Sequence, residues 1–294
     1  MPDNKSRNQD QRPNFDEIFR GVLNHHGHPF QHAVIRVAEE LRANKQTGWA
    51  LEFTEFPVNV RGKETHIDLV LRQEDVDLQN TLNYMVGECK RTNPALSTWC
   101  FVRAPYTRAN SSNMTLFVQN LRRENGGSYP GVSTLSSDKI YNLGFVVKTS
   151  VPGDHKPDGG RNAIQEAAGQ VCLGINGMLE FLADLEQRQP TKRRTRTQLV
   201  PVVFTTARVL TSEVDLGSAN ILDGKLPTDS VTTMERPWIW LNYPVSRSLK
   251  HSRQPESSSL KLGDIYDKEY LRSIAIVSST GIEEFLRLLL PFDA

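Results

Sequence analysis

The pattern of apolar and polar positions predicts alternating helices and strands. After Pro29, apolar residues recur at helical spacing in HPFQHAVIRVAEELRANKQTG, which predicts an amphipathic helix over about 29–45. The runs ALEFTEFPVNV, THIDLVLR and LNYMVGECKRT follow and are typical of three strands. A second helix is predicted for AIQEAAGQVCLGINGMLEFLADLEQR, with Asn162 as its cap. The continuous apolar run LVPVVFTTARVL then indicates a fully buried strand.

The order helix, three strands, helix, strand predicts an α/β fold with a mixed central sheet flanked by helices. Its core spans about 29–210. The irregular pattern over about 95–137 is interpreted as an insertion, after which DKIYNLGFVVKTS resumes a strand. The segment from about 212 to 294 is a C-terminal extension, with strands at WIWLNYPVS and SIAIVSS and a helix at IEEFLRLLL. We expect residues 1–14 to be disordered and residues 15–294 to form a single domain.

Composition narrows the classes of protein that remain. The chain has 294 residues, with 35 Lys and Arg against 34 Asp and Glu and a net charge of +1, which argues against a protein that coats nucleic acid by bulk charge. Three cysteines without a Cys-x-x-Cys pair argue against a disulfide framework and a zinc ribbon. There is no apolar leader and no run of about 20 apolar residues. We therefore expect a cytoplasmic protein with no membrane partner.

Two of the predicted strands carry the most informative side chains. Asp68 lies in HIDLVL, and GECK places Glu88 and Lys90 on one strand face while Cys89 points away. If the two runs pair as a hairpin, Asp68 joins them. Two carboxylates and the carbonyl of Cys89 then form an oxygen site suited to Mg²⁺ or Mn²⁺, beside a lysine that can position a nucleophile. Solvated strand ends are the alternative, against which the apolar neighbours argue.

HIDLVL and GECKR, within this order of elements, resemble the PD-(D/E)XK nuclease superfamily, which has the restriction-endonuclease-like fold. The resemblance covers about residues 29–210, although Ile67 stands where many members have proline. It implies a metal-dependent nuclease acting on DNA in restriction, phage defence or repair. It further implies that Asp68 and Glu88 bind the metal and that Lys90 orients the attacking water.

The resemblance also implies site residues on the two helices. Many members carry an acidic residue on the first helix, and we expect Glu39 to bind the metal, with Glu40 as the alternative. Glu40 stands four residues after Arg36, so a surface ion pair would also explain it. Some members use a glutamine on the crossover helix, which implies a catalytic role for Gln170, one turn after Glu166. A polar helix edge is the alternative there.

Basic residues are segregated despite the balanced total. The windows 89–123 and 187–212 each contain six Lys or Arg and no acid. We expect these windows to flank the site and to contact phosphates; a solvated positive face is the alternative. The expected nucleic-acid contacts are Arg91, Arg193, Arg194 and Arg196.

Other groupings have plainer interpretations. The histidines within residues 25–32 suit helix-entry polarity better than a zinc site. Trp238 and Trp240 share a strand face, and core packing explains them better than base stacking does.

Two other classes of function stay open. A catalytically silent module that binds nucleic acid or protein could retain the nuclease-like fold, because a nuclease core leaves the insertion and the extension unexplained. An unrelated interaction domain would be supported if Asp68 lay more than about a side chain's reach from Glu88. A homodimer is compatible with either interpretation, as is a partner protein from a defence or repair operon.

Overall fold

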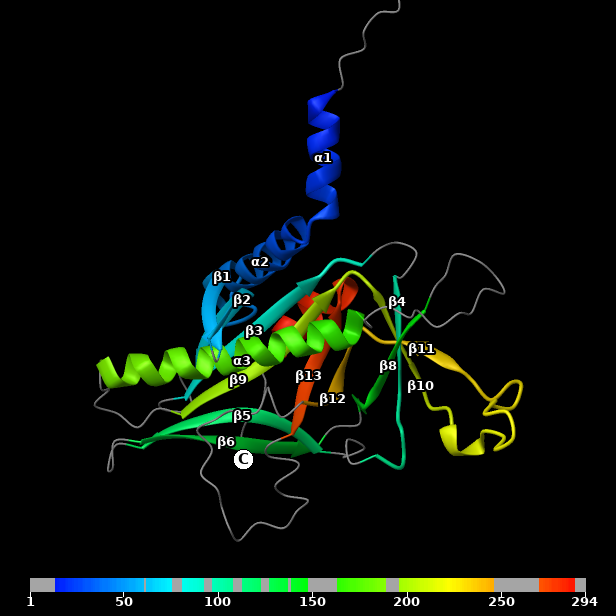
Figure 1. Ribbon diagram of the computed structural model, residues 1–294. Coiled ribbons are helices and arrows are strands. Elements are labelled where there is room, and N and C mark those ends of the chain that lie inside the picture. The colour runs from blue at the N-terminus through cyan, green and yellow to red at the C-terminus, as the bar shows by residue number, and fades with distance from the viewer. Residues whose placement is uncertain are drawn as a thin grey trace, which may run out of the picture.

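The computed structural model describes ten ranges of the chain, and Figure 1 shows how they are arranged. The N-terminal segment expected to be disordered lies, apart from Asn14, outside these ranges. The described ranges are 14–60, 62–75, 81–92, 97–107, 113–122, 127–136, 139–147, 163–188, 196–245 and 270–288.

The chain forms both helices and strands, and the two predicted core helices correspond to α2 and α3. The helices, with two short 3-10 turns, are α1 (Phe15–His25), α2 (His28–Ala43), α3 (Ala163–Arg188), η2 (Leu216–Ser218), η4 (Ser279–Gly281) and α5 (Ile282–Arg287). The strands are β1 (Ala50–Val60), β2 (Lys63–Asp75), β3 (Thr81–Lys90), β4 (Thr98–Val102), β5 (Asn113–Arg122), β6 (Gly127–Ser136), β7 (Ile140–Tyr141), β8 (Leu143–Val147), β9 (Arg196–Thr205), β10 (Arg208–Ser212), β11 (Thr233–Glu235), β12 (Trp238–Pro244) and β13 (Leu271–Ser278).

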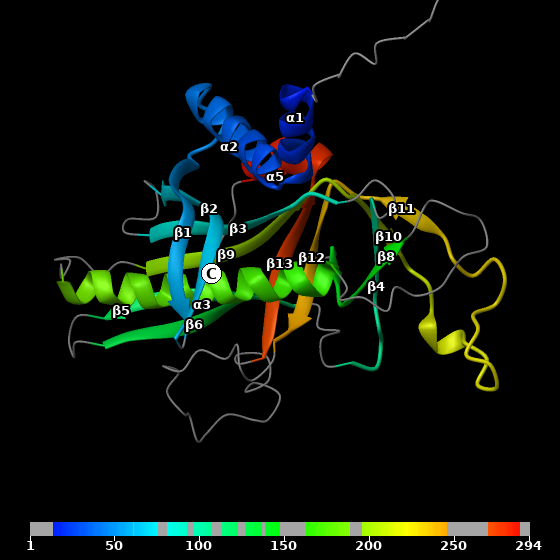
Figure 2. The same cartoon turned by 45° about the horizontal axis from the view of Figure 1, so that its top comes forward.

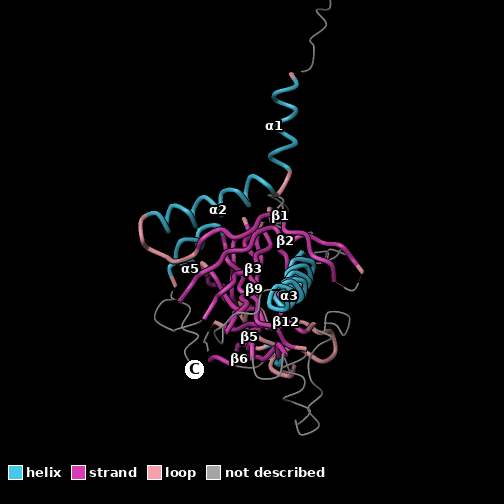
Figure 3. The backbone as a smooth tube through the Cα atoms, turned by 90° about the vertical axis from the view of Figure 1, so that its left-hand side faces the viewer, coloured by secondary structure: helices cyan, strands magenta, loops and turns pink. Residues whose placement is uncertain are grey.

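A mixed sheet forms the centre of the molecule. Seven of its nine strands follow the order β1-β2-β3-β9-β13-β12-β7. The other two, β5 and β6, form a hairpin that pairs with β9. Strands β1, β2 and β3 are antiparallel, whereas β3 with β9 and β9 with β13 are parallel. Figures 2 and 3 show the sheet between α3 on one face and the pair α2 and α5 on the other. The predicted mixed sheet flanked by helices is confirmed.

A second sheet, ordered β11-β10-β4-β8, corrects two strand predictions. The run LVPVVFTTARVL is not one strand, because β9 ends at Thr205 and β10 continues in the second sheet. The Thr205 hydroxyl accepts a hydrogen bond from the Ala207 amide at this bend. DKIYNLGFVVKTS is divided in the same way between β7 and β8. Both runs are rich in apolar residues on either side of the division, and such a pattern does not specify which sheet receives each part.

The predicted extension is part of the central sheet. Strand β13 lies between β9 and β12, and all eight of its residues are buried. Trp238 and Trp240 on β12 pack against Phe285 with ring centroids 5.7 and 6.3 Å away, which confirms that they are core residues. The core therefore continues beyond residue 210, and the region predicted as an irregular insertion contributes β4, β5 and β6.

Close packing of α3 positions it against β1, β2 and β3. A Cβ added at Gly177 would lie 2.4 Å from the Cβ of Val58, and one at Gly174 would lie 3.2 Å from Ile67 and from Val86. These glycines allow the helix to approach the sheet, as its glycine content predicts. Among the described helices, even α3 lacks the continuous apolar stretch that a membrane crossing needs.

Candidate functional site

Strands β2 and β3 separate at the residues that the sequence singles out. Their antiparallel pairing runs from Asp75 opposite Thr81 to Leu69 opposite Gly87 and ends there. Strand β3 continues beside β9 as far as Lys90, while β2 stays paired with β1. We call this place the β2–β3 fork; it consists of Asp68, Glu88, Cys89 and Lys90.

Side chains replace the missing strand pairing at the fork. The Cys89 amide donates a hydrogen bond of 2.7 Å to Oδ2 of Asp68, and Nζ of Lys90 lies 2.8 Å from Oε1 of Glu88. The predicted hairpin is thus confirmed, and it brings Asp68, Glu88 and Lys90 together. Asp68 accepts its hydrogen bond from the amide of Cys89, the residue next to Glu88, so the wide separation of Asp68 from Glu88 that would support an unrelated interaction domain is not observed.

The Cys89 carbonyl also points into the fork. A strand residue directs its amide and its carbonyl to the same side, and the Cys89 amide faces Asp68 on β2. The carbonyl oxygen lies 3.7 Å from a Cβ built on Gly27, at the start of α2. The Cys89 side chain packs in the core on the α2 side of the sheet. The carbonyl therefore lies on the Asp68 side of β3, and its role as a metal ligand stays a prediction.

Burial makes the two carboxylates hard to ionise together. Burial raises the pKa of Asp68, and the charge of Glu55 adds to this, while the Cys89 amide opposes it. The pKa of Glu88 is raised to about 7, first by burial and then by the charge of Asp68, against the opposing effect of Lys90. A bound cation would favour the ionised form of both carboxyls.

Helix α2 contributes residues that the sequence did not single out for the site. Nε2 of Gln31 donates a hydrogen bond to the main-chain carbonyl of Asp68. Nδ1 of His28, one turn earlier, lies 3.5 Å from Oε1 of Glu55 on β1. Glu55 has a φ of 46°, a left-handed conformation that costs roughly 1–2 kcal/mol for a residue with a Cβ. The shared helix face of His28 and Gln31 was a visible signal, whereas Glu55 becomes a neighbour only through the β1–β2 register.

Helix α3 covers the opposite face of the fork. The charge of Glu166 raises the pKa of Glu88, although burial has the larger effect. Gln170 follows one turn later, and its buried Oε1 has no hydrogen-bond partner among the described residues. A buried amide oxygen without a partner is uncommon and calls for an explanation such as a bound water or ion. The catalytic role of Gln170 stays a prediction.

Glu39 does not reach the fork. It follows Gln31 by eight residues, about 12 Å along the helix, and its Oε1 accepts a hydrogen bond of 3.0 Å from the Leu51 amide at the start of β1. Its Oε2 accepts bonds of 2.8 and 3.1 Å from Arg42. The Glu39 carboxylate therefore links α2 to β1. Its position does not support the prediction that Glu39 binds the metal. Glu40 pairs with Arg36 at 3.0 Å, as its surface alternative predicts.

The predicted basic contacts are dispersed. Arg91 is exposed directly beside the fork. Arg196 begins β9, whereas Thr205 at the other end of that strand pairs with Lys90; nine strand residues separate these ends by about 30 Å. Because β9 is parallel to β3, the crossover connection returns the chain to the opposite edge of the sheet before β9 begins. This explains why Arg196 lies far from Lys90. Arg193 and Arg194 lie outside the described residues.

Two arginines of the basic windows are engaged within the fold. Arg103 lies 3.0 Å from Glu213, and Arg208 lies 2.7 Å from Glu235. At these two positions, an ion pair within the fold explains the basic side chain without a phosphate contact.

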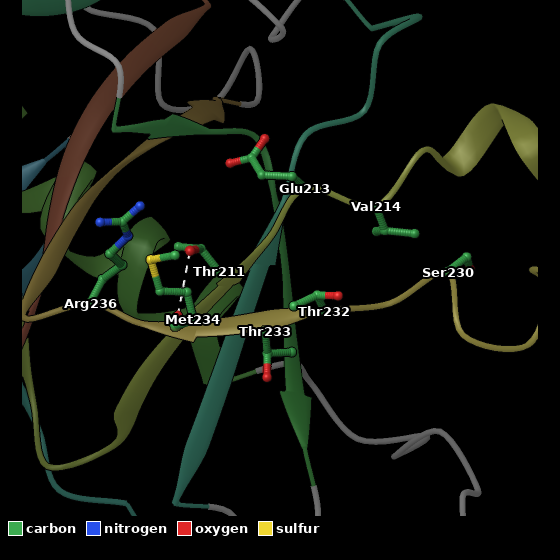
Figure 4. Close-up of a pocket in the computed structure, with 8 residues that line it drawn as sticks. All are labelled: Thr211, Glu213, Val214, Ser230, Thr232, Thr233, Met234 and Arg236. Carbon is green, nitrogen blue, oxygen red and sulfur yellow. Dashed lines mark hydrogen bonds between the residues drawn. The ribbon is translucent and has the colours of Figure 1, made fainter.

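A separate cavity of about 270 Å³ lies beside β10 and β11, far along β10 from the fork (Figure 4). Its carboxylate, Glu213, already accepts hydrogen bonds from Arg103 and Tyr141. Without a second carboxylate, this cavity offers a poorer metal site than the fork does. Its lining residues are Thr211, Glu213, Val214, Ser230, Thr232, Thr233, Met234 and Arg236.

The oxygen atoms at the fork fit Mg²⁺ or Mn²⁺. Asp68 and Glu88 offer carboxylates and Cys89 offers a carbonyl, while Mg²⁺ commonly keeps several waters. Within the described ranges, no group of three or more His, Cys, Asp or Glu side chains is placed to bind an ion, so water and substrate would complete the coordination.

Family models, curated proteins and solved structures contain no match to this chain.

Proposed function

We propose that this chain is a Mg²⁺- or Mn²⁺-dependent nuclease that hydrolyses phosphodiester bonds in DNA. The observation that carries the proposal is the β2–β3 fork, where Asp68 is bonded to the Cys89 amide and lies beside the Glu88–Lys90 pair. Two desolvated carboxylates, a free carbonyl and a lysine are the groups that metal-assisted phosphodiester hydrolysis uses.

The proposed roles follow from the positions of the groups. Asp68 and Glu88 would hold the ion with the Cys89 carbonyl, and a bound ion would acidify a water and offset charge on the phosphate. The Cys89 amide keeps Asp68 oriented, and Gln31 fixes the backbone of Asp68 from α2. The Lys90 ammonium, which is paired with Glu88, would orient the attacking water.

We further propose membership of the PD-(D/E)XK superfamily. The order α2, β1, β2, β3, α3, β9 supports it, with β4 to β8 inserted between β3 and α3. Strands β1, β2 and β3 are antiparallel, and β9 is parallel to β3. Asp68 and the Glu88-x-Lys90 pair occupy the adjacent strands β2 and β3, as the superfamily pattern implies. Arg91 beside the fork would contact a phosphate of the DNA. Restriction, phage defence and repair stay the expected contexts.

Cleavage of DNA tests the proposal. Purified protein is incubated with plasmid and with linear DNA, with and without Mg²⁺ or Mn²⁺, beside Asp68→Ala and Lys90→Ala. Glu40→Ala serves as a control, because Glu40 pairs with Arg36 on the surface. We expect metal-dependent cleavage by wild type and by the control only. Equal cleavage by all four proteins would overturn the assignment.

The second sheet favours one other candidate, a silent binding module that keeps the nuclease-like fold. Its strands β4, β8, β10 and β11 and its cavity lie outside the order of elements on which the nuclease proposal rests. Calorimetry separates the two functions: the nuclease requires a Mg²⁺ or Mn²⁺ site that disappears in Asp68→Ala, and the silent module requires none.

A further inference from the structure

Helix α1 exposes an apolar face. Phe15, Ile18, Phe19, Val22 and Leu23 are between 41% and 72% exposed. They recur at the spacing of one helix face, and they lie together on 11 residues of chain. Scattered exposed apolar residues are ordinary, whereas a contiguous set of this kind marks an interaction site.

The helix projects from the rest of the molecule. Figures 1 and 3 show α1 directed outward, with its C-terminal end joined to α2 and its N-terminal end away from the sheets. Only the short link at His26 and Gly27 separates the two helices. Among the described residues, no element covers the apolar face.

We propose that α1 pairs antiparallel with α1 of a second copy of this chain. Each helix is attached to its own molecule at the C-terminal end, so antiparallel pairing places the two molecules at opposite ends of the helix pair. Parallel pairing would bring both to the same end, where they would compete for space. The apolar set is centred on Phe19, which places this residue opposite the partner's Phe19.

The charges beside the apolar face favour the same arrangement. Asp16 and Arg20 lie on one flank of α1, and neither forms an ion pair with another described residue. An antiparallel pair brings like flanks together, and centring on Phe19 places Asp16 within about 3 Å, along the axis, of the level of the partner's Arg20. Two such ion pairs form by symmetry, whereas a parallel pair would not bring these flanks together.

The pairing has a consequence for the fork. His28 and Gln31, which contact Glu55 and Asp68, follow directly after the link to α1. The two forks would therefore flank a helix pair about 16 Å long and be related by twofold symmetry, an arrangement suited to the two strands of a duplex. Only this consequence rests on the proposed nuclease function.

Molecular mass in solution tests the pairing without metal or DNA, so its failure is distinct from failure of the nuclease proposal. Light scattering during gel filtration should give about twice the 33.2 kDa of one chain at concentrations up to about 100 µM, since small interfaces give weak association. Phe19→Ser should raise the dissociation constant at least tenfold. Ile221→Ser, at a residue 97% exposed elsewhere, should leave it unchanged.

A monomeric wild type throughout that range would overturn the proposal, and so would a dimer that Phe19→Ser leaves intact. Because Phe19 is 63% exposed, the variant should keep the circular dichroism and thermal midpoint of wild type. A dimer that both serine variants weaken equally would also count against α1 as the interface.

Cysteine cross-linking tests the orientation. Phe19→Cys should form a disulfide-linked dimer under mild oxidation, whereas Phe15→Cys should not, because antiparallel residues at this position lie about 12 Å apart. Wild type, with Cys89 and Cys172 buried, controls for native thiols. Arg20→Asp should weaken the dimer and Asp16→Arg with Arg20→Asp should restore it. Efficient linking through Phe15→Cys alone would overturn the antiparallel arrangement.

Discussion

Two pairs of a carboxylate and a cation in this chain have almost the same length and opposite electrostatics. Lys90 lies 2.8 Å from Glu88 at the fork, and Arg208 lies 2.7 Å from Glu235 in the second sheet. The pKa of Glu88 is raised to about 7, chiefly by burial, whereas the hydrogen bond from Arg208 lowers the pKa of the exposed Glu235. Contact with a cation therefore does not by itself determine the state of a carboxylate.

The difference follows from the sheet. Glu235 pairs across β10 and β11 at the exposed edge of the second sheet, where water screens the charge. Glu88 lies on a central strand between β2 and β9, beneath α3 and beside Asp68. Burial, reinforced by the charge of Asp68, outweighs one lysine there. In this chain, contact with a cation lowers the pKa of the carboxyl at the exposed edge, whereas burial outweighs that contact at the break in the central sheet.

The largest expected effect comes from separating metal binding from activity at the fork. Asp68→Asn keeps an oxygen that can accept from the Cys89 amide but loses its charge, so both Mn²⁺ binding and DNA cleavage should fall at least 100-fold. Lys90→Ala should lose cleavage to a similar degree while it retains Mn²⁺ binding. Calorimetry and a cleavage assay give the two readouts. If Lys90→Ala cleaves DNA as wild type does, Lys90 has no role in cleavage. The Lys90–Glu88 pair would then differ from the Arg208–Glu235 pair only in burial.

The pH dependence of stability should differ in sign between the two pairs. A carboxyl whose pKa is raised from 4.5 to about 7 in the folded state makes the folded protein bind a proton more tightly. Its contribution to stability is present below its ordinary pKa and is lost as the pH rises through about 7. Glu88→Gln should therefore stabilise the metal-free protein by about 2 kcal/mol at high pH and have little effect at low pH.

Urea unfolding at about pH 5 and about pH 8 measures the effect at Glu88, and unfolding at about pH 3 and about pH 5 measures the opposite effect at Glu235. Glu235→Gln is the matched control, because the lowered pKa of Glu235 contributes stability above its ordinary pKa that is lost as the pH falls. An equal pH dependence for Glu88→Gln and wild type would show that Glu88 is ionised throughout and that the contrast between the pairs is absent.

A smaller effect should follow from loosening the helix that buries the fork. Gly177→Ala places a Cβ 2.4 Å from Val58 and should destabilise the fold by about 1–3 kcal/mol. Gly169→Ala, on the same helix with nothing within 4 Å, should stabilise it by about 0.5–1 kcal/mol. Urea unfolding of both variants provides the comparison. Equal stabilities would mean that α3 is not held closely against β1.

The smallest effect is expected at the second pair. Arg208→Ala removes an exposed ion pair and should change neither the thermal midpoint nor DNA cleavage measurably, because solvent screens such pairs. The cleavage assay used for Lys90→Ala provides the readout. Loss of cleavage in Arg208→Ala would give the second sheet a functional role and remove the contrast between the two regions.

Local pattern was sufficient for some parts of the fold and not for others. The strand alternation around Asp68 and around Glu88 predicted a hairpin, and this pairing forms. The period of 3.6 residues predicted α2 and α3. The division of one apolar run at Thr205 between two sheets was not predictable, because each half has the pattern of a buried strand.

The site shows the same division. Asp68, Glu88 and Lys90 were recognisable because their order and spacing are local properties. Glu39 was misplaced because a helical pattern identifies a buried face but not which turn lies over the fork.

The sequence by itself determined the classes of the elements, the hairpin that joins Asp68 to Glu88, and the shared face of Glu88 and Lys90, because these depend on periodicity within a few residues. Only the tertiary structure decided that Gln31 and Glu55 adjoin the fork, that Arg196 lies at the far end of the sheet, and that α1 is uncovered. These depend on register, on the path of the crossover and on packing between distant segments, and no local pattern encodes them.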